Sequence, residues 1–246
     1  MSKRLVLSVI IPCLNEVGTV ERLLEQCIEQ NTSEVEVIAV DNKSDDNTLQ
    51  ILSGFKTQGI QVVSDIERGV SRARNAGAAQ AQGEWLLFLD ADTVLPAHFL
   101  RDLTKLLLNQ PKFRLAAVSY RATSKSLLFR LLTWCAIMYQ RVSFLLFRRP
   151  LIPGAVCLVK RSVHEEIGGF NESILYNEDF DYSTRAYKVA ESFKTIRRPF
   201  VYFSTRRLEN GGWHKVIATY IQAEFARLRG KRYDPENYDM SDHSMK

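Results

Sequence analysis

The stretch Trp85-Leu-Leu-Phe-Leu-Asp-Ala-Asp92 decides the fold of this chain. Five consecutive apolar residues are typical of a strand that is buried on both faces, and two carboxylates follow where this strand ends. Burial would penalise both charges unless a cation neutralised them. Hard oxygen ligands favour Mg²⁺ or Mn²⁺ over zinc, and such ions usually keep positions open for substrate phosphates. By itself, the Asp-x-Asp pattern fits a helix N-cap and a surface acid ahead of Pro96 equally well.

Outward from this stretch, apolar runs alternate with segments of helical spacing. The other runs predicted as strands are Leu5–Ile11, Val35–Val40 and Ile60–Val63. The helices are expected at Glu16–Glu29, from Asp45-Asp46-Asn47 to about Lys56, at Gly69–Gln82, and from Pro96 to about Asn109. Four strand-then-helix units predict an α/β fold of Rossmann-like type, with a mainly parallel sheet and helices on both faces.

The second half of the chain is less regular. We expect an apolar helix at Ser126–Phe147, a strand at Gly154–Val159 and a helix through Arg185. A strand pair near Phe193–Phe203 and a last helix from about Trp213 are expected to follow. Neither a repeat nor a linker is visible. The sequence therefore predicts one domain over residues 1–232, followed by a polar, frayed tail at 233–246.

Bulk composition narrows the classes of function that fit this chain. The 246 residues carry 33 Lys and Arg against 28 Asp and Glu, a formal charge of +5. This mild excess does not indicate nucleic acid as a partner, and it suits a phosphate-rich substrate or an anionic membrane surface equally. A hydrophobic content of 46% excludes a disordered chain.

The cysteines and the N-terminus predict a cytoplasmic protein. Cys13, Cys27, Cys135 and Cys157 show no C-x-x-C spacing, so we expect buried free thiols in a reducing compartment. The N-terminal sequence MSKRLVLSVIIP has only a short apolar run that ends in proline. It is expected to be a strand rather than a signal peptide.

Three of the predicted strands end in polar loops. These loops are Pro12–Glu16, Asp41–Ser44 and Asp90–Asp92. Ligands of parallel α/β sheets bind beyond the carboxyl ends of the strands, so we expect the three loops to border one cleft. A nicotinamide site is not indicated, because no G-x-G-x-x-G turn follows the first strand.

The motifs occur in an order that resembles a known family. They are Val9-Ile-Ile-Pro-x-x-Asn-Glu16, Val40-Asp-Asn-x-Ser-x-Asp-x-Thr48, Arg74-Asn-x-Gly77, Leu87–Asp92, Gly168-Gly-Phe170 and Glu178-Asp-x-Asp181. Together they resemble family 2 glycosyltransferases with a GT-A fold, over roughly residues 5–205. The resemblance implies a nucleotide-sugar-binding half at 1–110, and a smaller mixed acceptor-binding half at 111–232.

The resemblance implies a role for individual residues on the donor side. Residues that would bind the nucleotide sugar are Pro12, Asn15, Glu16, Asp41, Ser44, Arg74, Asp90, Arg206 and Arg207. A carboxylate at Asp41 suits a uracil imide or a ribose hydroxyl, although a turn-forming Asp fits this loop as well. Which of Arg68, Arg72 and Arg74 faces the cleft stays open.

Metal binding and base catalysis are implied in the same way. Asp92, helped by Asp90, would hold Mg²⁺ or Mn²⁺ against the donor diphosphate, and His214 is a candidate third ligand. Asp179 matches the family's general base, which takes a proton from the acceptor hydroxyl. Its acidic neighbours Glu178 and Asp181 also fit the first turn of a helix, without any catalytic role.

The implied reaction moves one sugar from a UDP- or GDP-sugar to an acceptor hydroxyl with inversion. The Gln-x-x-Arg-Trp motif of processive synthases is missing, which favours single transfers. Two alternatives stay open: a polyprenyl-phosphate sugar synthase, and a nucleotide-sugar-binding protein without catalysis. The acceptor itself, whether a glycan, a lipid-linked molecule or a small molecule, is not indicated.

The apolar segment at 126–149 makes a peripheral membrane contact one expectation. Arg130, Gln140 and Arg141 interrupt it, and such residues are costly at a bilayer centre. A helix lying on the inner face of the membrane, a groove for a lipid-linked acceptor, and a buried helix covering the sheet all fit this pattern.

Overall fold

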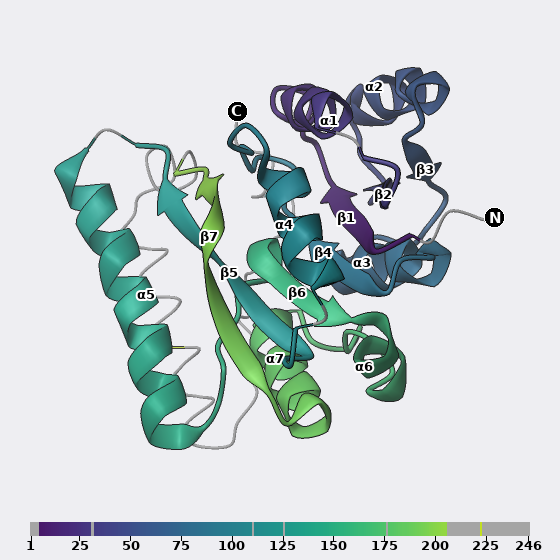
Figure 1. Cartoon of the computed structure of the whole chain (residues 1–246). Helices are drawn as coiled ribbons and strands as arrows, with labels where there is room; N and C mark the ends of the chain where they lie inside the picture. Colours follow the sequence, from purple (N-terminus) through teal and green to yellow (C-terminus); the bar gives the residue numbers. More distant parts are fainter. Residues whose placement is uncertain are drawn as a thin grey trace.

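The computed structural model of the chain describes residues 5–30, 32–109, 111–124, 126–175, 177–205 and 222 (Figure 1). Within these residues, one sheet runs in the order β3-β2-β1-β4-β6-β5-β7. Its strands are β1 (Leu7–Cys13), β2 (Val35–Asp41), β3 (Gln61–Val63), β4 (Trp85–Phe88), β5 (Leu115–Ala122), β6 (Cys157–Lys160) and β7 (Phe193–Phe203). Strands from both halves of the chain thus share one sheet.

The sheet is mainly parallel, as the sequence predicts. β1 lies between β2 and β4 and pairs with both in parallel, and β2 pairs with β3 in parallel. β6 is antiparallel to both of its neighbours, β4 and β5, whereas β5 and β7 are parallel. Every strand except β6 therefore ends at the same edge of the sheet.

Helices cover both faces of the sheet, which confirms the second part of the prediction. They are α1 (Val20–Glu29), α2 (Thr48–Gly54), α3 (Val70–Gln80), α4 (Phe99–Leu108), α5 (Leu127–Phe147), α6 (Arg161–Glu166) and α7 (Glu178–Ala190), with short 3-10 turns at Lys56–Gln58 and Gly154–Val156. Side chains alternate along a strand: Leu7, Val9 and Ile11 face the core shared with α1, α2 and α4. Ile10 faces the core shared with α3, α6 and α7.

The sequence analysis was wrong about the last strands. The expected strand pair is a single strand, β7, which runs along the whole of β5, a strand that the analysis did not predict. Ile196 pairs with Val118, but the next pair in register is Phe200 with Ser119. Residues 197–199 are out of register, but the strand continues through them to Phe203.

Two smaller expectations also need correction. The strand expected from Gly154 begins at Cys157, because residues 154–156 form a 3-10 turn. All four cysteines are free, but only three are buried: Cys135 is exposed. It lies on α5, which Figure 1 shows along the β5–β7 side of the sheet, far from β3.

Candidate active site

Topology brings the site together at one edge of the sheet. Residue Phe88 at the end of β4 is paired with Cys157 at the start of the antiparallel strand β6. The turn before β6 therefore lies beside the turn after β4, and these two turns contain Gly154 and Asp90. The first two polar loops lie at the same edge, because Cys13 and Asp41 are partners at the ends of β1 and β2.

Hydrogen bonds fix the first two loops against each other. The backbone N–H of Asn15 donates to Oγ of Ser44 at 3.1 Å, and Oδ1 of Asn15 accepts from the N–H of Asp45 at 2.8 Å. The N–H of Glu16 donates to Oγ1 of Thr48 at 2.9 Å. Pro12, Asn15, Glu16 and Ser44 thus lie at the ends of two adjacent strands, and the hydrogen bonds give Asn15 and Ser44 a structural role.

Asp41 is buried with one carboxylate oxygen unused. Its side chain is 4% exposed, and Oδ2 accepts from the N–H of Ser44 at 3.3 Å. Oδ1 has no hydrogen-bond partner among the described residues. A buried acceptor without a donor is costly, so the arrangement suits a ligand that brings an N–H or O–H group.

Arg74 is the arginine of the third helix that enters the site. It is 4% exposed; its Nη1 donates to Oε1 of Glu178 at 2.7 Å, and its Nη2 to Oδ1 of Asp90 at 3.4 Å. Burial by itself lowers the pKa of Arg74, but the charges of Glu178, Asp90 and Asp179 outweigh it, so that the pKa lies above its ordinary value. Arg74 therefore stays charged and joins carboxylates from both halves.

The other two arginines are half-buried and pair with exposed carboxylates. Arg68 pairs with Asp45 at 3.1 Å, and Arg72 pairs with Glu67 at 2.8 Å and with Glu172 at 3.3 Å. Surface pairs of this kind contribute little to stability. Of the three arginines, Arg74 is the one that is buried against Asp90 and Glu178.

Asp179 is a buried carboxyl group whose pKa is raised. Its carboxylate accepts from the N–H of Gly154 at 3.0 Å and from the N–H of Phe180 at 2.8 Å. Burial, followed by repulsion from Glu178, raises its pKa to about 7, against the opposing effects of Arg74 and the two N–H groups. A carboxylate with this pKa can accept a proton near neutral pH.

The two acidic neighbours of Asp179 each form an ion pair with an arginine. Asp181 accepts from Nε of Arg185 at 2.8 Å, a pair four residues apart on α7. Glu178 is taken by Arg74. Asp181 therefore fits the alternative of an acidic residue in the first turn of a helix, without a catalytic role. Glu178 contributes to the site through its ion pair with Arg74.

The Asp90–Asp92 turn lies between the two halves. The N–H of Thr93 donates to the carbonyl of Asp90 at 3.0 Å, and Val94 then forms an antiparallel bridge with Tyr202 near the end of β7. Asp92 is 6% exposed. Within the described part of the chain, no group of three or more His, Cys, Asp or Glu residues could hold a metal ion. Two carboxylates alone suit a hard cation that takes its remaining ligands from phosphate oxygens.

Three predicted site residues, Arg206, Arg207 and His214, lie outside the described residues. The described chain reaches this edge of the sheet at Thr205, which is 1% exposed. The roles of the three residues in donor and metal binding stay predictions.

The sequence analysis did not single out Gly154, although this residue is part of the site. A Cβ atom at this position would lie within 2.5 Å of Cζ of Arg74. The Gly154 N–H also donates to Asp179, so the residue contacts both charged groups. The one signal in the sequence that could have indicated a role for Gly154 is the Pro-Gly pair ahead of an apolar run. This pair is equally typical of an ordinary turn.

The structure explains two motifs that carried no role in the sequence analysis. The Nδ2 group of Asn75 donates to the carbonyl of Phe170 at 2.9 Å, and Oδ1 of Asn75 accepts from the N–H of Phe170 at 2.8 Å. Gly169 has a φ of +74°, and a Cβ there would meet Oδ1 of Asn75 at 2.6 Å. The two motifs thus lock together and hold α3, and with it Arg74, in place.

Comparison with protein families agrees with this geometry. The sequence model of Glycosyl transferase family 2 matches residues 8–168, which include the three polar loops and Gly154. This chain belongs to glycosyl transferase family 2. The family resemblance inferred from the motifs is therefore confirmed.

Two curated family 2 relatives match most of this chain. Poly-beta-1,6-N-acetyl-D-glucosamine synthase of Staphylococcus epidermidis is 27% identical over 225 residues, which cover 86% of this chain and 53% of the synthase. The poly(ribitol-phosphate) beta-N-acetylglucosaminyltransferase TarS of Staphylococcus aureus is 25% identical over 209 residues, or 81% of this chain and 35% of TarS. This chain thus spans about half the length of the first relative and about a third of the second.

Solved structures share the fold of this family 2 chain. The complex of S. aureus TarS 1-349 with UDP superposes with a TM-score of 0.66 at 20% identity, covering 90% of this chain and 70% of TarS 1-349. The mannosyltransferase PcManGT of Pyrobaculum calidifontis, in complex with GDP-Man and Mn²⁺, gives 0.70 at 20% identity, covering 99% of this chain and 69% of PcManGT. The expected GT-A fold is thus confirmed.

Proposed function

We propose that this chain transfers a single sugar from a UDP- or GDP-sugar to an acceptor hydroxyl, with inversion at the anomeric carbon. One observation carries the proposal: Arg74 joins Asp90 on the donor side to Glu178, the neighbour of Asp179, on the acceptor side. A carboxylate turn and a candidate base therefore face one another across a single buried cation. Named relatives that bind UDP, UDP-GlcNAc or GDP-Man support this choice of donor.

On the donor side, Asp41 receives the base or ribose. Its buried Oδ1 lacks a partner among the described residues, so that a uracil or guanine N–H, or a ribose hydroxyl, would satisfy it. Pro12, Asn15, Glu16 and Ser44 shape this pocket through the contacts between the two loops. Arg206 and Arg207 would contact the diphosphate, to which arginine binds in a bidentate manner.

Asp92 is the main metal ligand in this proposal, Asp90 the second and His214 a candidate third. The pair of carboxylates fits Mg²⁺ or Mn²⁺, and two solved neighbours contain Mn²⁺ with a nucleotide or a nucleotide sugar. A bound ion would neutralise the charge on the departing nucleoside diphosphate. Asp90 also contacts Arg74 at 3.4 Å, so the protein supplies a second positive charge beside the same turn.

On the acceptor side, Asp179 removes the proton from the attacking hydroxyl. The Gly154 and Phe180 N–H groups orient its carboxylate, while burial keeps its pKa near neutrality. The hydroxyl then attacks the anomeric carbon from the face opposite the diphosphate, which inverts the configuration.

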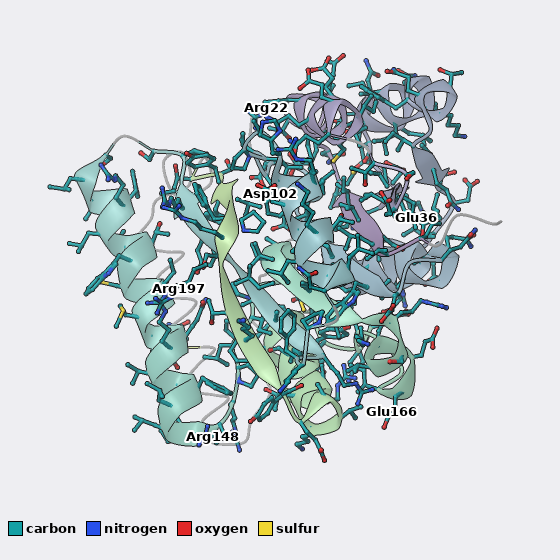
Figure 2. The ribbon with its side chains drawn as sticks, in the orientation of Figure 1. Arg22, Glu36, Asp102, Arg148, Glu166 and Arg197 are labelled. Atoms are coloured by element: carbon teal, nitrogen blue, oxygen red, sulfur yellow. The ribbon has the colours of Figure 1, made fainter. Side chains whose placement is uncertain are left out.

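The test is release of nucleoside diphosphate from a panel of UDP- and GDP-sugars, with and without a chelator. Asp92→Asn and Asp179→Asn are expected to lower turnover by a factor of about a hundred or more. Asp102→Asn is the matched control, because Asp102, labelled in Figure 2, is a 52% exposed carboxylate on α4 that pairs with its neighbour Arg101. Wild-type rates in both site variants would disprove the proposal.

Binding gives a second readout. A nucleotide sugar that binds the folded protein with Mn²⁺ raises its melting temperature by mass action. Such a rise without turnover on any acceptor would support the alternative of a binding protein without catalysis. An NMR assignment of the product anomer tests inversion.

A groove beside the site favours one second candidate, transfer to a polyprenyl phosphate. The groove holds about 310 Å³ between α5 and the strands β5 and β7, and its apolar lining includes two cations, Arg141 and Arg197. It also includes Tyr120, whose pKa is raised to about 12 by burial and, to a smaller extent, by the charge of Asp179. A phosphate acceptor needs no base, so activity retained in Asp179→Asn would favour this candidate.

A further inference from the structure

The exposed face of α5 is the largest feature that the proposed reaction does not use. Among the described residues, twelve large hydrophobic side chains are exposed, and nine of them belong to α5. Leu127, Leu131, Trp134, Val142 and Leu145 are 44–78% exposed and recur at spacings of three, four or eight residues. At 3.6 residues per turn, this spacing forms one continuous apolar stripe along a helix.

The opposite face of α5 fixes the helix to the protein. Phe144 packs edge-on against Phe193 of β7 and Tyr187 of α7, with ring centroids 4.8 and 5.5 Å apart. Nε2 of Gln140 donates to the hydroxyl of Tyr120 on β5 at 3.2 Å. The apolar stripe therefore lies on the face of α5 that is turned away from these contacts.

Charge is distributed unevenly around the stripe. From Leu103 to His164 the sequence contains no Asp or Glu, but eleven Lys and Arg. Arg130 and Arg141 are eleven residues apart, about three helical turns, which places them in one row along a flank of the stripe. In the part of the chain that the structure describes, no carboxylate forms an ion pair with either of these two arginines.

We propose that α5 binds the surface of an anionic lipid bilayer, with its apolar stripe inserted between the headgroups and the row of arginines on lipid phosphates. Helices with an apolar face, a cationic flank and interfacial aromatic residues bind membranes in this orientation. Trp134 and Tyr139, 57% and 46% exposed, supply aromatic side chains of the type found at membrane interfaces. In the described residues, no helix has the length and apolar character needed to cross a bilayer.

Co-sedimentation of the full chain with vesicles tests the proposal. Vesicles of phosphatidylcholine with 30% phosphatidylglycerol should bind at least ten times more protein than neutral phosphatidylcholine vesicles, and high salt should weaken the binding. The double variant Leu131→Glu/Leu145→Glu should lose this binding. Leu108→Glu/Leu175→Glu is the matched control, because these leucines are 52% and 55% exposed but lie outside α5.

Two further measurements test whether Trp134 inserts into the bilayer and whether the arginines contribute to vesicle binding. In a Trp213→Phe background, brominated lipids should quench the fluorescence of the parent protein more strongly than that of its Trp134→Phe variant, because the remaining tryptophan, Trp85, is buried. Arg130→Gln/Arg141→Gln should lower vesicle binding, whereas Arg22→Gln, on α1, should not. Equal binding to neutral and anionic vesicles, or no binding, would overturn the proposal. So would a dimer, measured by sedimentation equilibrium, that Leu131→Glu/Leu145→Glu abolishes, since a second copy would then cover α5.

Discussion

Arg74 on α3 donates a hydrogen bond from Nη1 to Oε1 of Glu178 on α7 at 2.7 Å, although 104 positions separate the two residues in the sequence. Both side chains are largely buried, at 5% and 14% exposure. A buried charge without its partner is costly, so this contact ties the donor and acceptor sides of the site together.

Arg74→Met should therefore destabilise the protein by about 3 kcal/mol and abolish sugar transfer. The change leaves Glu178 without its partner and removes the cation beside Asp90. Urea unfolding and initial-rate measurements check the two effects separately. Arg72→Met, at a 41% exposed arginine on the same helix, should cost less than about 1 kcal/mol. If the free energy of unfolding falls equally in both variants, the Arg74–Glu178 contact contributes no more to stability than an exposed ion pair.

Gly154→Ala should impair the site through Arg74. The added Cβ would overlap the guanidinium, which Glu178 and Asp90 hold in place, so we expect a loss of about 1–3 kcal/mol and a lower turnover number. Gly54→Ala on α2 is the matched control, since nothing lies within 4 Å of the Cβ added there. A Gly154→Ala protein with wild-type melting temperature and turnover would contradict the packing described here.

Asp41→Asn should weaken nucleoside diphosphate binding about tenfold, equivalent to about 1.4 kcal/mol. The substitution removes the charge from a buried oxygen that has no partner among the described residues. Calorimetric titration with UDP and with GDP measures the loss and shows which nucleotide is preferred. Asp45→Asn, at a side chain that is 72% exposed, should leave both affinities unchanged. Equal affinities in wild type and Asp41→Asn would exclude Asp41 from the pocket.

The pH dependence of transfer should follow Asp179. Its pKa is raised to about 7, and a base works only when deprotonated, so kcat/KM should rise with pH and level off above about pH 7. Asp181→Asn, which removes only a pair with Arg185, should keep this profile. A profile that is flat between pH 5 and 8 would argue against Asp179 as the base.

The same pKa predicts an effect on stability. A carboxyl whose pKa is higher in the folded than in the unfolded protein reduces stability as pH rises from about 4 to about 7. Asn cannot ionise, so Asp179→Asn should gain stability relative to wild type at pH 8 and show no such gain at pH 4. Thermal melts at the two pH values measure the difference. Lost activity together with gained stability would distinguish a functional carboxylate from a structural one.

Much of the fold follows from local sequence. The continuous apolar runs of β1, β2 and β4 predict buried parallel strands, because no other element places every side chain of a short run in the core. The polar residues at the ends of these strands, such as Asp41 and Asp90, could then be assigned to one edge by a general rule of α/β sheets. Strand β5 was missed because its burial changes along its length, from Leu115 in the core to the exposed Arg121.

The sequence by itself determined the family, the parallel half of the sheet, and the carboxylates Asp41, Asp90, Asp92 and Asp179 as candidate site residues, because these depend on apolar runs and on motifs within short segments. Only the tertiary structure decided that Arg74 is the buried arginine. It also showed that Gly154 must be small and that α5 keeps an apolar face exposed. The contacts of Arg74 and Gly154 depend on the reversed direction of β6, which brings the Gly154 turn beside the Asp90 turn. Contacts of this kind join residues far apart in the chain, and no local pattern encodes them.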